Sequence, residues 1–274
     1  MLTTNTALRH WRKSAPQRLA YAKVDNLISS KKRDVNTSPG QPLKRRAVTT
    51  SPRGEALSGS IEVPSDPQFN SARDAIALVE RVHGVQGLKI TMGTYPLGPN
   101  TDAAYLPAQN AFEKSGMILY NPAKRVSRIA FLEEFGHALD HQAFSQFDGL
   151  ASSVGNSDVE SVFDSIRESN THARVKSYTL GQSVMLRRDG RLVRETITNG
   201  RTLAYEQSLV EWFARAYVQF IVVSTGDAQL LEQLATLRTS ESFELLYPNA
   251  WPNTEFEPIT ASLERVLREK GWMR

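Results

Sequence analysis

The sequence predicts an α+β fold, in which a small twisted sheet packs on one long helix and the C-terminal half is mostly helical. Three segments are apolar or alternate in hydropathy, as strands do: residues 87–95, 102–112 and 115–122. A helix is predicted over residues 122–144, because Pro122 favours a first helical turn and apolar residues recur at helical spacing. A second long helix is predicted over residues 205–224.

The shorter elements follow from the same patterns. Residues 71–85 and 157–168 each predict a helix that opens near a serine. Residues 183–198 predict a hairpin that turns at Asp189 and Gly190. Three further helices are predicted toward the C-terminus: residues 227–237, 240–247 and 257–272.

Two parts of the chain differ in composition and define the predicted domains. Residues 1–70 are rich in Pro, Ser, Thr and Gly and hold few apolar side chains, so they are predicted to be a basic, disordered tail and linker. Residues 71–274 are predicted to form one folded domain. Because residues 1–24 lack an apolar core, no Sec-type signal peptide is expected.

Charge and cysteine content exclude several classes of protein. Residues 1–60 hold 12 Lys and Arg against 3 Asp and Glu, a formal charge of +9, whereas residues 61–274 hold 21 against 26, a charge of −5. An acidic body argues against nucleic-acid binding, since phosphate contacts need clustered cations. The absence of Cys excludes disulfides, cysteine zinc fingers and a cysteine nucleophile. No apolar run reaches the roughly 20 residues of a membrane-spanning helix.

The most informative segment is EEFGHALDH, residues 133–141. Positions four apart share one face of a helix, so Glu133, His137 and His141 form a stripe with Glu134 beside it. The metallopeptidase motif H-E-x-x-H uses this spacing: two ligands at i and i+4 hold a metal ion, and the Glu at i+1 activates water. The present sequence reads E-E-x-x-H, with Glu133 at the first ligand position.

A second segment, EWFARAY at residues 211–217, offers Glu211 on a separate helix, where a third metal ligand is often found. Together, EEFGHALD and EWFARAY resemble the segments HEFGHA(L/V)D and EFFAEAF of the catalytic domain of anthrax lethal factor and related zincin toxins. The apolar segment GMILYNP fits the strand that lines a zincin cleft. The resemblance covers residues 87–247 and is weaker over residues 150–200.

This resemblance implies a zincin-like fold, one Zn²⁺ ion and a role for each matching residue. Glu134 would be the general base, and Asp140 would orient a ligand. His141 is expected either at the surface or beside the ligands rather than as a ligand itself. Tyr205 is expected near the developing oxyanion, although it stands one residue closer to the third ligand than in the family's pattern. Three residues would bind the metal: Glu133, His137 and Glu211.

Glu133 leaves three interpretations open. It can bind the metal itself, although two carboxylates and one imidazole cancel the charge of a divalent cation and make bound water less acidic. Alternatively, His137 and His141 supply the pair at i and i+4, with Asp140 as base. In the third interpretation the metal is lost and the domain is a pseudoenzyme.

Other notable residues have structural interpretations. Gly136 is expected to allow close packing of the active helix, and His83 and His172 are expected on the surface. Core positions are expected for Trp212, Phe213 and Tyr217. Four hairpin arginines are expected to be solvated, with binding of an acidic substrate segment as the alternative: Arg187, Arg188, Arg191 and Arg194.

The basic N-terminal segment carries its own hypothesis. Two clusters separated by ten residues resemble a bipartite nuclear localisation signal that an import receptor reads: Lys31, Lys32, Arg33, Lys44, Arg45 and Arg46. A basic tail without a signal, an organellar presequence and a leader for export are the alternatives. DNA binding by this tail would show as a steep salt dependence.

The resemblance to zincin toxins implies a secreted or translocated zinc metallopeptidase, a toxin or effector that cleaves host proteins. It would enter the host nucleus if the basic clusters act as a signal. Glu134 would deprotonate a metal-activated water that attacks a peptide carbonyl. The alternative is a degenerate zincin that binds a host protein without cutting it.

Overall fold

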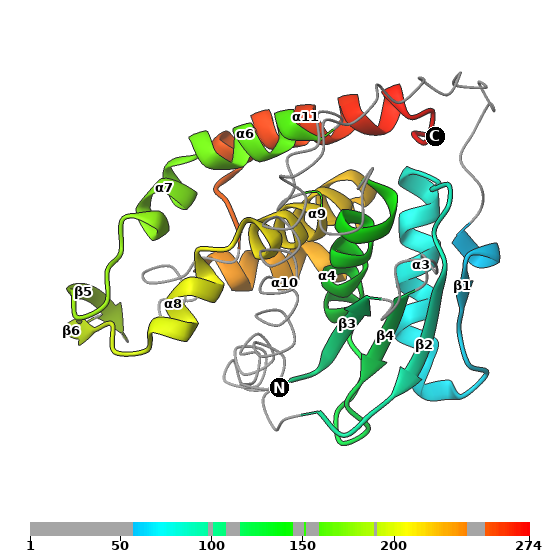
Figure 1. The fold of residues 1–274 in the computed structure, drawn as a ribbon, viewed down its shortest axis with the longest axis horizontal. Coiled ribbons are helices and arrows are strands. Elements are labelled where there is room, and N and C mark those ends of the chain that lie inside the picture. The colour runs from blue at the N-terminus through cyan, green and yellow to red at the C-terminus, as the bar shows by residue number, and fades with distance from the viewer. Residues whose placement is uncertain are drawn as a thin grey trace, which may run out of the picture.

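The computed structural model is an α+β structure with a small mixed sheet, and it describes residues 57–97, 101–107, 116–144, 151, 159–188, 191–239 and 250–274 (Figure 1). The six nuclear-localisation candidates lie outside these residues, as do the helix predicted over residues 240–247 and the hairpin turn at Asp189 and Gly190. In the described part, a four-stranded sheet and a separate two-stranded hairpin are accompanied by helices, two of which, α4 and α9, carry the site.

The sheet has the strand order β1-β2-β4-β3. Its central strands β2 and β4 are parallel, and β3 runs antiparallel to β4 at one edge, where Tyr105 lies opposite Ile118. Three of these strands confirm the sequence prediction, and β1 was not predicted. Their bounds are β1 (Ile61–Glu62), β2 (Ile90–Thr94), β3 (Ala103–Pro107) and β4 (Gly116–Tyr120).

The predicted domain boundary at residue 70 is wrong, because the fold begins earlier. Two short 3-10 turns, η2 (Leu57–Gly59) and η3 (Pro67–Phe69), flank β1 and lead into helix α3 (Asn70–Val82). Both Leu57 and Phe69 are buried in the same core as α3 and the sheet. These apolar residues are too few and too widely spaced to give a periodic signal, which is why the segment resembles a linker.

The helix predicted over residues 122–144 begins later and ends differently than predicted. Helix α4 (Arg128–Ala138) is capped by the hydroxyl of Ser127, so Pro122 lies before the helix and not at its start. Beyond α4 the chain continues as one π-helical turn, η4 (Leu139–Ala143). Such turns insert one extra residue into a helix and often occur at functional sites.

The helix predicted over residues 205–224 is two helices. Helix α8 (Gly200–Glu206) and helix α9 (Leu209–Thr225) are separated by residues 207–208, which form the break between them. The indole N–H of Trp212 spans this break and donates to the main-chain oxygen of Glu206 at 2.8 Å. The hydrophobic pattern continues across the break, so the sequence alone does not reveal it.

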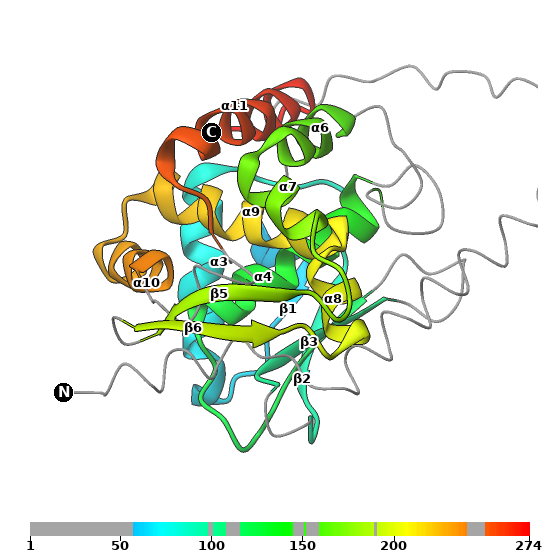
Figure 2. The same ribbon diagram turned by 90° about the vertical axis from the view of Figure 1, so that its left-hand side faces the viewer.

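Four further helices pack around α9. Helix α6 lies beside α11 across one side of the molecule, as Figures 1 and 2 show, and both contact α9, as does α10. Three of them confirm predicted helices, and α7 was not predicted. Their bounds are α6 (Glu160–Glu168), α7 (Asn170–Lys176), α10 (Ala228–Thr239) and α11 (Asn253–Glu269).

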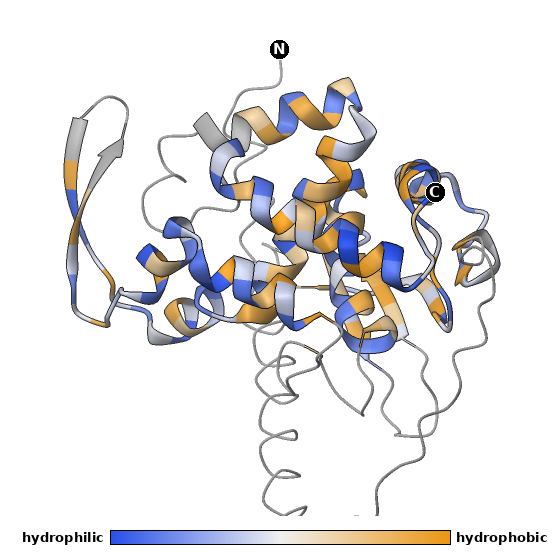
Figure 3. Ribbon diagram, turned by 90° about the horizontal axis from the view of Figure 1, so that it is seen from above, coloured by the Kyte–Doolittle hydropathy of each residue, from blue (hydrophilic) through white to orange (hydrophobic). Residues whose placement is uncertain are grey.

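The hairpin of β5 (Ser183–Arg188) and β6 (Arg191–Thr196) confirms the prediction and projects from the body (Figure 3). Met185, opposite Arg194, is 54% exposed, and Arg194 is exposed as expected. The side chains of the other three hairpin arginines lie outside the described part of the structure.

Two histidines predicted on the surface are buried instead. His83 is fully buried, and its Nδ1 and Nε2 lie 2.8 Å from the oxygen of Gly84 and the hydroxyl of Tyr217. His172 packs edge-on against Trp212, with ring centroids 5.3 Å apart. The rings Trp212, Phe213 and Tyr217 lie in the core as predicted. Within the described residues, no helix has the length and apolar character needed to cross a membrane.

Candidate metal centre

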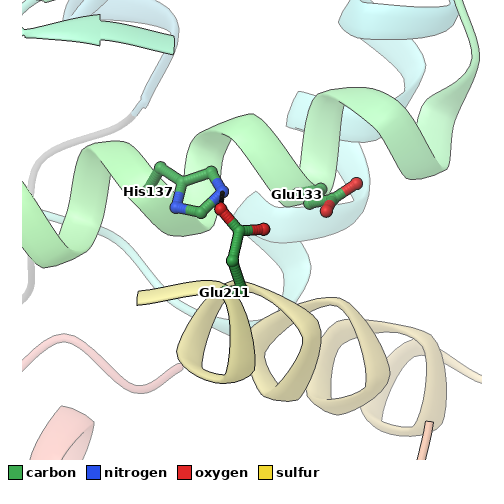
Figure 4. A group of neighbouring side chains, drawn as sticks. All are labelled: Glu133, His137 and Glu211. Carbon is green, nitrogen blue, oxygen red and sulfur yellow. Dashed lines mark ion pairs between the residues drawn. The ribbon is translucent and has the colours of Figure 1, made fainter. Parts of the chain in front are cut away.

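Three predicted ligands converge at the crossing of α4 and α9. Glu133 and His137 project from α4 toward Glu211 on α9, and one ligand atom from each lies within 4.8 Å of the others (Figure 4). Nε2 of His137 is 3.8 Å from Oε1 of Glu211. Ligands of one tetrahedral zinc ion lie about 3.4 Å apart, so small side-chain rotations would bring these atoms to bonding positions.

Close packing of the two helices brings the ligands together. Gly136 precedes His137 on α4 and faces Ala214, which follows Glu211 by three residues on α9. A Cβ atom at position 136 would lie 3.0 Å from the Cα of Ala214, closer than ordinary van der Waals contact. The predicted packing role of Gly136 is therefore confirmed.

The donor set fits a divalent cation. Carboxylate oxygen and imidazole nitrogen are ligands of zinc and other first-row metals, and Glu133, His137 and Glu211 are all buried. Buried carboxylates are costly unless cations or hydrogen-bond donors balance them. In the part of the chain that the structure describes, this is the one group of acidic and imidazole side chains that converges in this way.

Tyr205 contacts one of the ligands directly. Its hydroxyl group, on α8, donates a hydrogen bond to Oε2 of Glu211, while Oε1 of the same carboxylate faces His137. Burial raises the pKa of Tyr205 well above its ordinary value, and the charges of Glu211 and Glu133 raise it further. The phenol therefore stays protonated and restrains Glu211 so that one oxygen faces the ligand cluster.

A buried cation that the sequence analysis did not single out lies beside the ligands. Arg215, on α9, is 3% exposed, and its Nη2 forms an ion pair with Oε2 of Glu206 at 2.6 Å. Burial lowers the pKa of Arg215, but the charges of Glu206, Glu211 and Glu133 raise it more. The available signal was an arginine in an otherwise apolar helix, four residues after a predicted ligand.

The predicted base, Glu134, turns toward the sheet. Its carboxylate is 2% exposed, and Oε2 accepts the main-chain N–H of Tyr105 on the edge strand β3 at 2.6 Å. The hydroxyl of Tyr120, at the end of β4, is also buried, and burial together with the charge of Glu134 raises its pKa. Neither tyrosine was predicted at the site, because only the strand order brings them there.

The structure does not place His141 among the ligands. Its Nδ1 lies 2.9 Å from the hydroxyl of Tyr105, and the converging group consists of Glu133, His137 and Glu211. Asp140 is fully buried at the start of the same π-helical turn. The geometry therefore favours Glu133 over His141 as the partner of His137.

No protein-family model, no curated protein and no solved structure matches this chain, so a functional assignment rests on the residues of the site.

Proposed function

We propose that this chain is a zinc-dependent peptidase of the secreted or translocated toxin and effector class, acting on proteins of a host cell. One observation carries the proposal: Glu133, His137 and Glu211 converge in a buried site, and Glu134 occupies the next position on the same helix. The two segments that meet there are the ones that resemble the lethal factor family of zincins, which favours a peptide bond as the substrate.

The chemistry follows from the position of each side chain. A zinc ion held by Glu133, His137 and Glu211 would polarise a peptide carbonyl and acidify water. In that chemistry Glu134 would take the proton from the attacking water and pass it to the leaving amine. Tyr205 keeps Glu211 oriented, and Arg215, which is paired with Glu206, interacts electrostatically with the two candidate ligand carboxylates.

The basic N-terminal clusters fit delivery into a host cell. An import receptor would read the two Lys and Arg clusters between Lys31 and Arg46, which would place the peptidase in the host nucleus. The acidic body, with a charge of −5 over residues 61–274, argues against nucleic acid as the target of the folded domain.

A second candidate function is protein binding by a degenerate zincin. The observation that favours it is that Tyr205 and Glu134 both have hydrogen-bond partners within the protein, Glu211 and the Tyr105 N–H. These hydrogen bonds stabilise part of the buried negative charge of the site without a metal ion. In addition, Glu133 is a carboxylate at the position where a zincin has a second imidazole, and a carboxylate ligand makes any metal-bound water less acidic than an imidazole would.

Cleavage of a peptide library distinguishes the two functions. The full chain, supplied with zinc, is incubated with peptides derived from a host-cell proteome, and new amino termini are identified. The peptidase predicts new termini with wild-type protein and none with Glu134→Gln, which keeps the ligands but removes the base. A protein-binding function predicts no new termini with either protein.

A further inference from the structure

Tyr105 links the predicted base to the turn that follows the active helix. Its main-chain N–H donates to Oε2 of Glu134 at 2.6 Å. Its hydroxyl group accepts the side-chain N–H of Gln142 at 2.9 Å and lies 2.9 Å from Nδ1 of His141. One residue of the edge strand therefore contacts both the middle of α4 and the π-helical turn η4.

The phenol of Tyr105 is itself fixed by the sheet. Oε1 of Gln142 accepts the main-chain N–H of Lys89 at 2.9 Å, and the oxygen of Lys89 accepts the N–H of Gly116 at 2.9 Å. Position 116 must lack a side chain, because a Cβ atom there would overlap the ring of Tyr105 and lie 2.6 Å from Nε2 of Gln142. The start of β2 and the start of β4 thus hold the hydroxyl in place.

The π-helical turn supplies both contacts. The N–H of Phe144 donates to the oxygen of Leu139 at 3.0 Å, a bond that spans five residues and widens the turn. The adjacent residues His141 and Gln142 both reach the same hydroxyl of Tyr105 from this turn. The π-helical turn therefore supplies the two side chains that hold the hydroxyl of Tyr105 on strand β3.

A general base must be held within hydrogen-bond reach of the proton it removes. Strand β3 is an edge strand that pairs with β4 alone in the described sheet, and the outward N–H of Tyr105 restrains Glu134. We propose that Tyr105 is a positioning residue. Its phenol is held by Gln142 and His141 and packs against Gly116, which fixes strand β3. The main-chain N–H of Tyr105 on that strand then orients Glu134. This inference rests on the proposed role of Glu134 as general base.

Hydrogen exchange of the amide at position 105, followed by NMR on the full chain, tests this link without a substrate or a metal. Tyr105→Phe keeps the N–H and removes only the hydroxyl clamp. Amide exchange at position 105 is expected to accelerate at least tenfold relative to core amides of β4. Gly116→Ala places a methyl group against the ring of Tyr105 and the amide of Gln142, which disturbs the same contact. It is expected to give the same acceleration.

The matched control is Tyr217→Phe, which also removes a buried phenol hydroxyl, here bonded to His83 at 2.8 Å and distant from the base in the hydrogen-bond network. It is expected to leave exchange at position 105 unchanged once global stability is taken into account. Glu134→Ala is expected to accelerate the exchange, because the acceptor is gone. Unchanged exchange in Tyr105→Phe and Gly116→Ala would overturn the proposal.

Kinetics separate positioning from binding. With a cleaved peptide in hand, Tyr105→Phe is expected to lower kcat about tenfold, while KM and zinc affinity stay within twofold of wild type, because the hydroxyl contacts His141 and Gln142 and none of the three candidate ligands. A raised KM with unchanged kcat would contradict the positioning role. If the chain neither binds zinc nor cuts peptides, the proposed function fails, yet the exchange experiment still decides whether Tyr105 orients Glu134.

Discussion

The hydroxyl group of Tyr205 donates to Oε2 of Glu211, and the other oxygen of that carboxylate lies 3.8 Å from Nε2 of His137. A phenol on α8 thus sets the orientation of a candidate ligand on α9 toward a candidate ligand on α4. Outer hydrogen-bond partners of this kind fix the geometry of metal ligands and tune their basicity. The break between α8 and α9 is what allows this contact.

Tyr205→Phe should weaken zinc binding about tenfold, because losing a partner of a ligand typically costs 10–100-fold in metal affinity. Competition with a chromogenic chelator measures the affinity. Tyr217→Phe is the matched control, since it removes a buried hydroxyl elsewhere in the core. Equal zinc affinities of wild type and Tyr205→Phe would show that the phenol does not restrain Glu211.

Arg215→Met should destabilise the fold by about 1.5–3 kcal/mol, because it leaves the partly buried carboxylate of Glu206 without its partner. Urea unfolding monitored by tryptophan fluorescence measures the loss. The double variant Glu206→Gln with Arg215→Met should recover part of it, since no charge is then left unpaired. Additive losses in the double variant would argue against a coupled pair.

Gly136→Val should separate α4 from α9, because even a Cβ atom there would lie 3.0 Å from the Cα of Ala214. Overpacking of this kind costs about 1–3 kcal/mol, and zinc affinity should fall with stability as Glu211 moves away from His137. Gly59→Val is the control, because no atom lies within 4 Å of a Cβ at that position. Equal effects of the two substitutions would contradict the close crossing of the helices.

His83 should make the fold sensitive to acid. Burial, opposed by its bond to Gly84 and assisted by the charge of Arg274, lowers its pKa from 6.5 to about 4. Below pH 6.5 the unfolded chain binds a proton that the folded chain does not, so stability falls as the pH falls toward 4 and levels off below it. The loss from this group is roughly 3 kcal/mol at most.

Urea unfolding at pH 7, 6, 5 and 4 checks this expectation. In His83→Gln, which cannot titrate, the stability should decline less steeply between pH 6.5 and 4 than in wild type. Parallel declines in the two proteins would show that His83 is not held neutral by the fold.

Parts of this structure follow directly from local sequence patterns. Three of the four strands, helices α3, α6, α10 and α11, and the hairpin each have a strong period or turn signal. The stripe of Glu133 and His137 follows from helical spacing alone, and Glu211 from its similarity to a known ligand segment.

The remainder depends on contacts between segments far apart in the chain. Ser127 ends the loop before α4, but nothing in the pattern distinguishes this cap from the earlier Pro122. Tyr205 and Leu209 keep helical spacing across the polar residues 206–208, so the periodicity alone does not reveal the break, although Ser208 is the N-cap of α9. The contact between Glu134 and Tyr105 requires β3 to be the edge strand beside α4, which only the sheet order determines.

The metal content of the purified full chain tests the central claim most directly. Elemental mass spectrometry measures the zinc content per chain, first without added zinc and again after zinc is supplied and the excess removed. The zinc contents are compared among wild type, His137→Ala, Glu211→Gln and Glu134→Gln. The account predicts about one zinc ion per wild-type chain, kept in Glu134→Gln and lost in the two ligand variants. No bound metal in wild type, even after zinc is supplied, would contradict it.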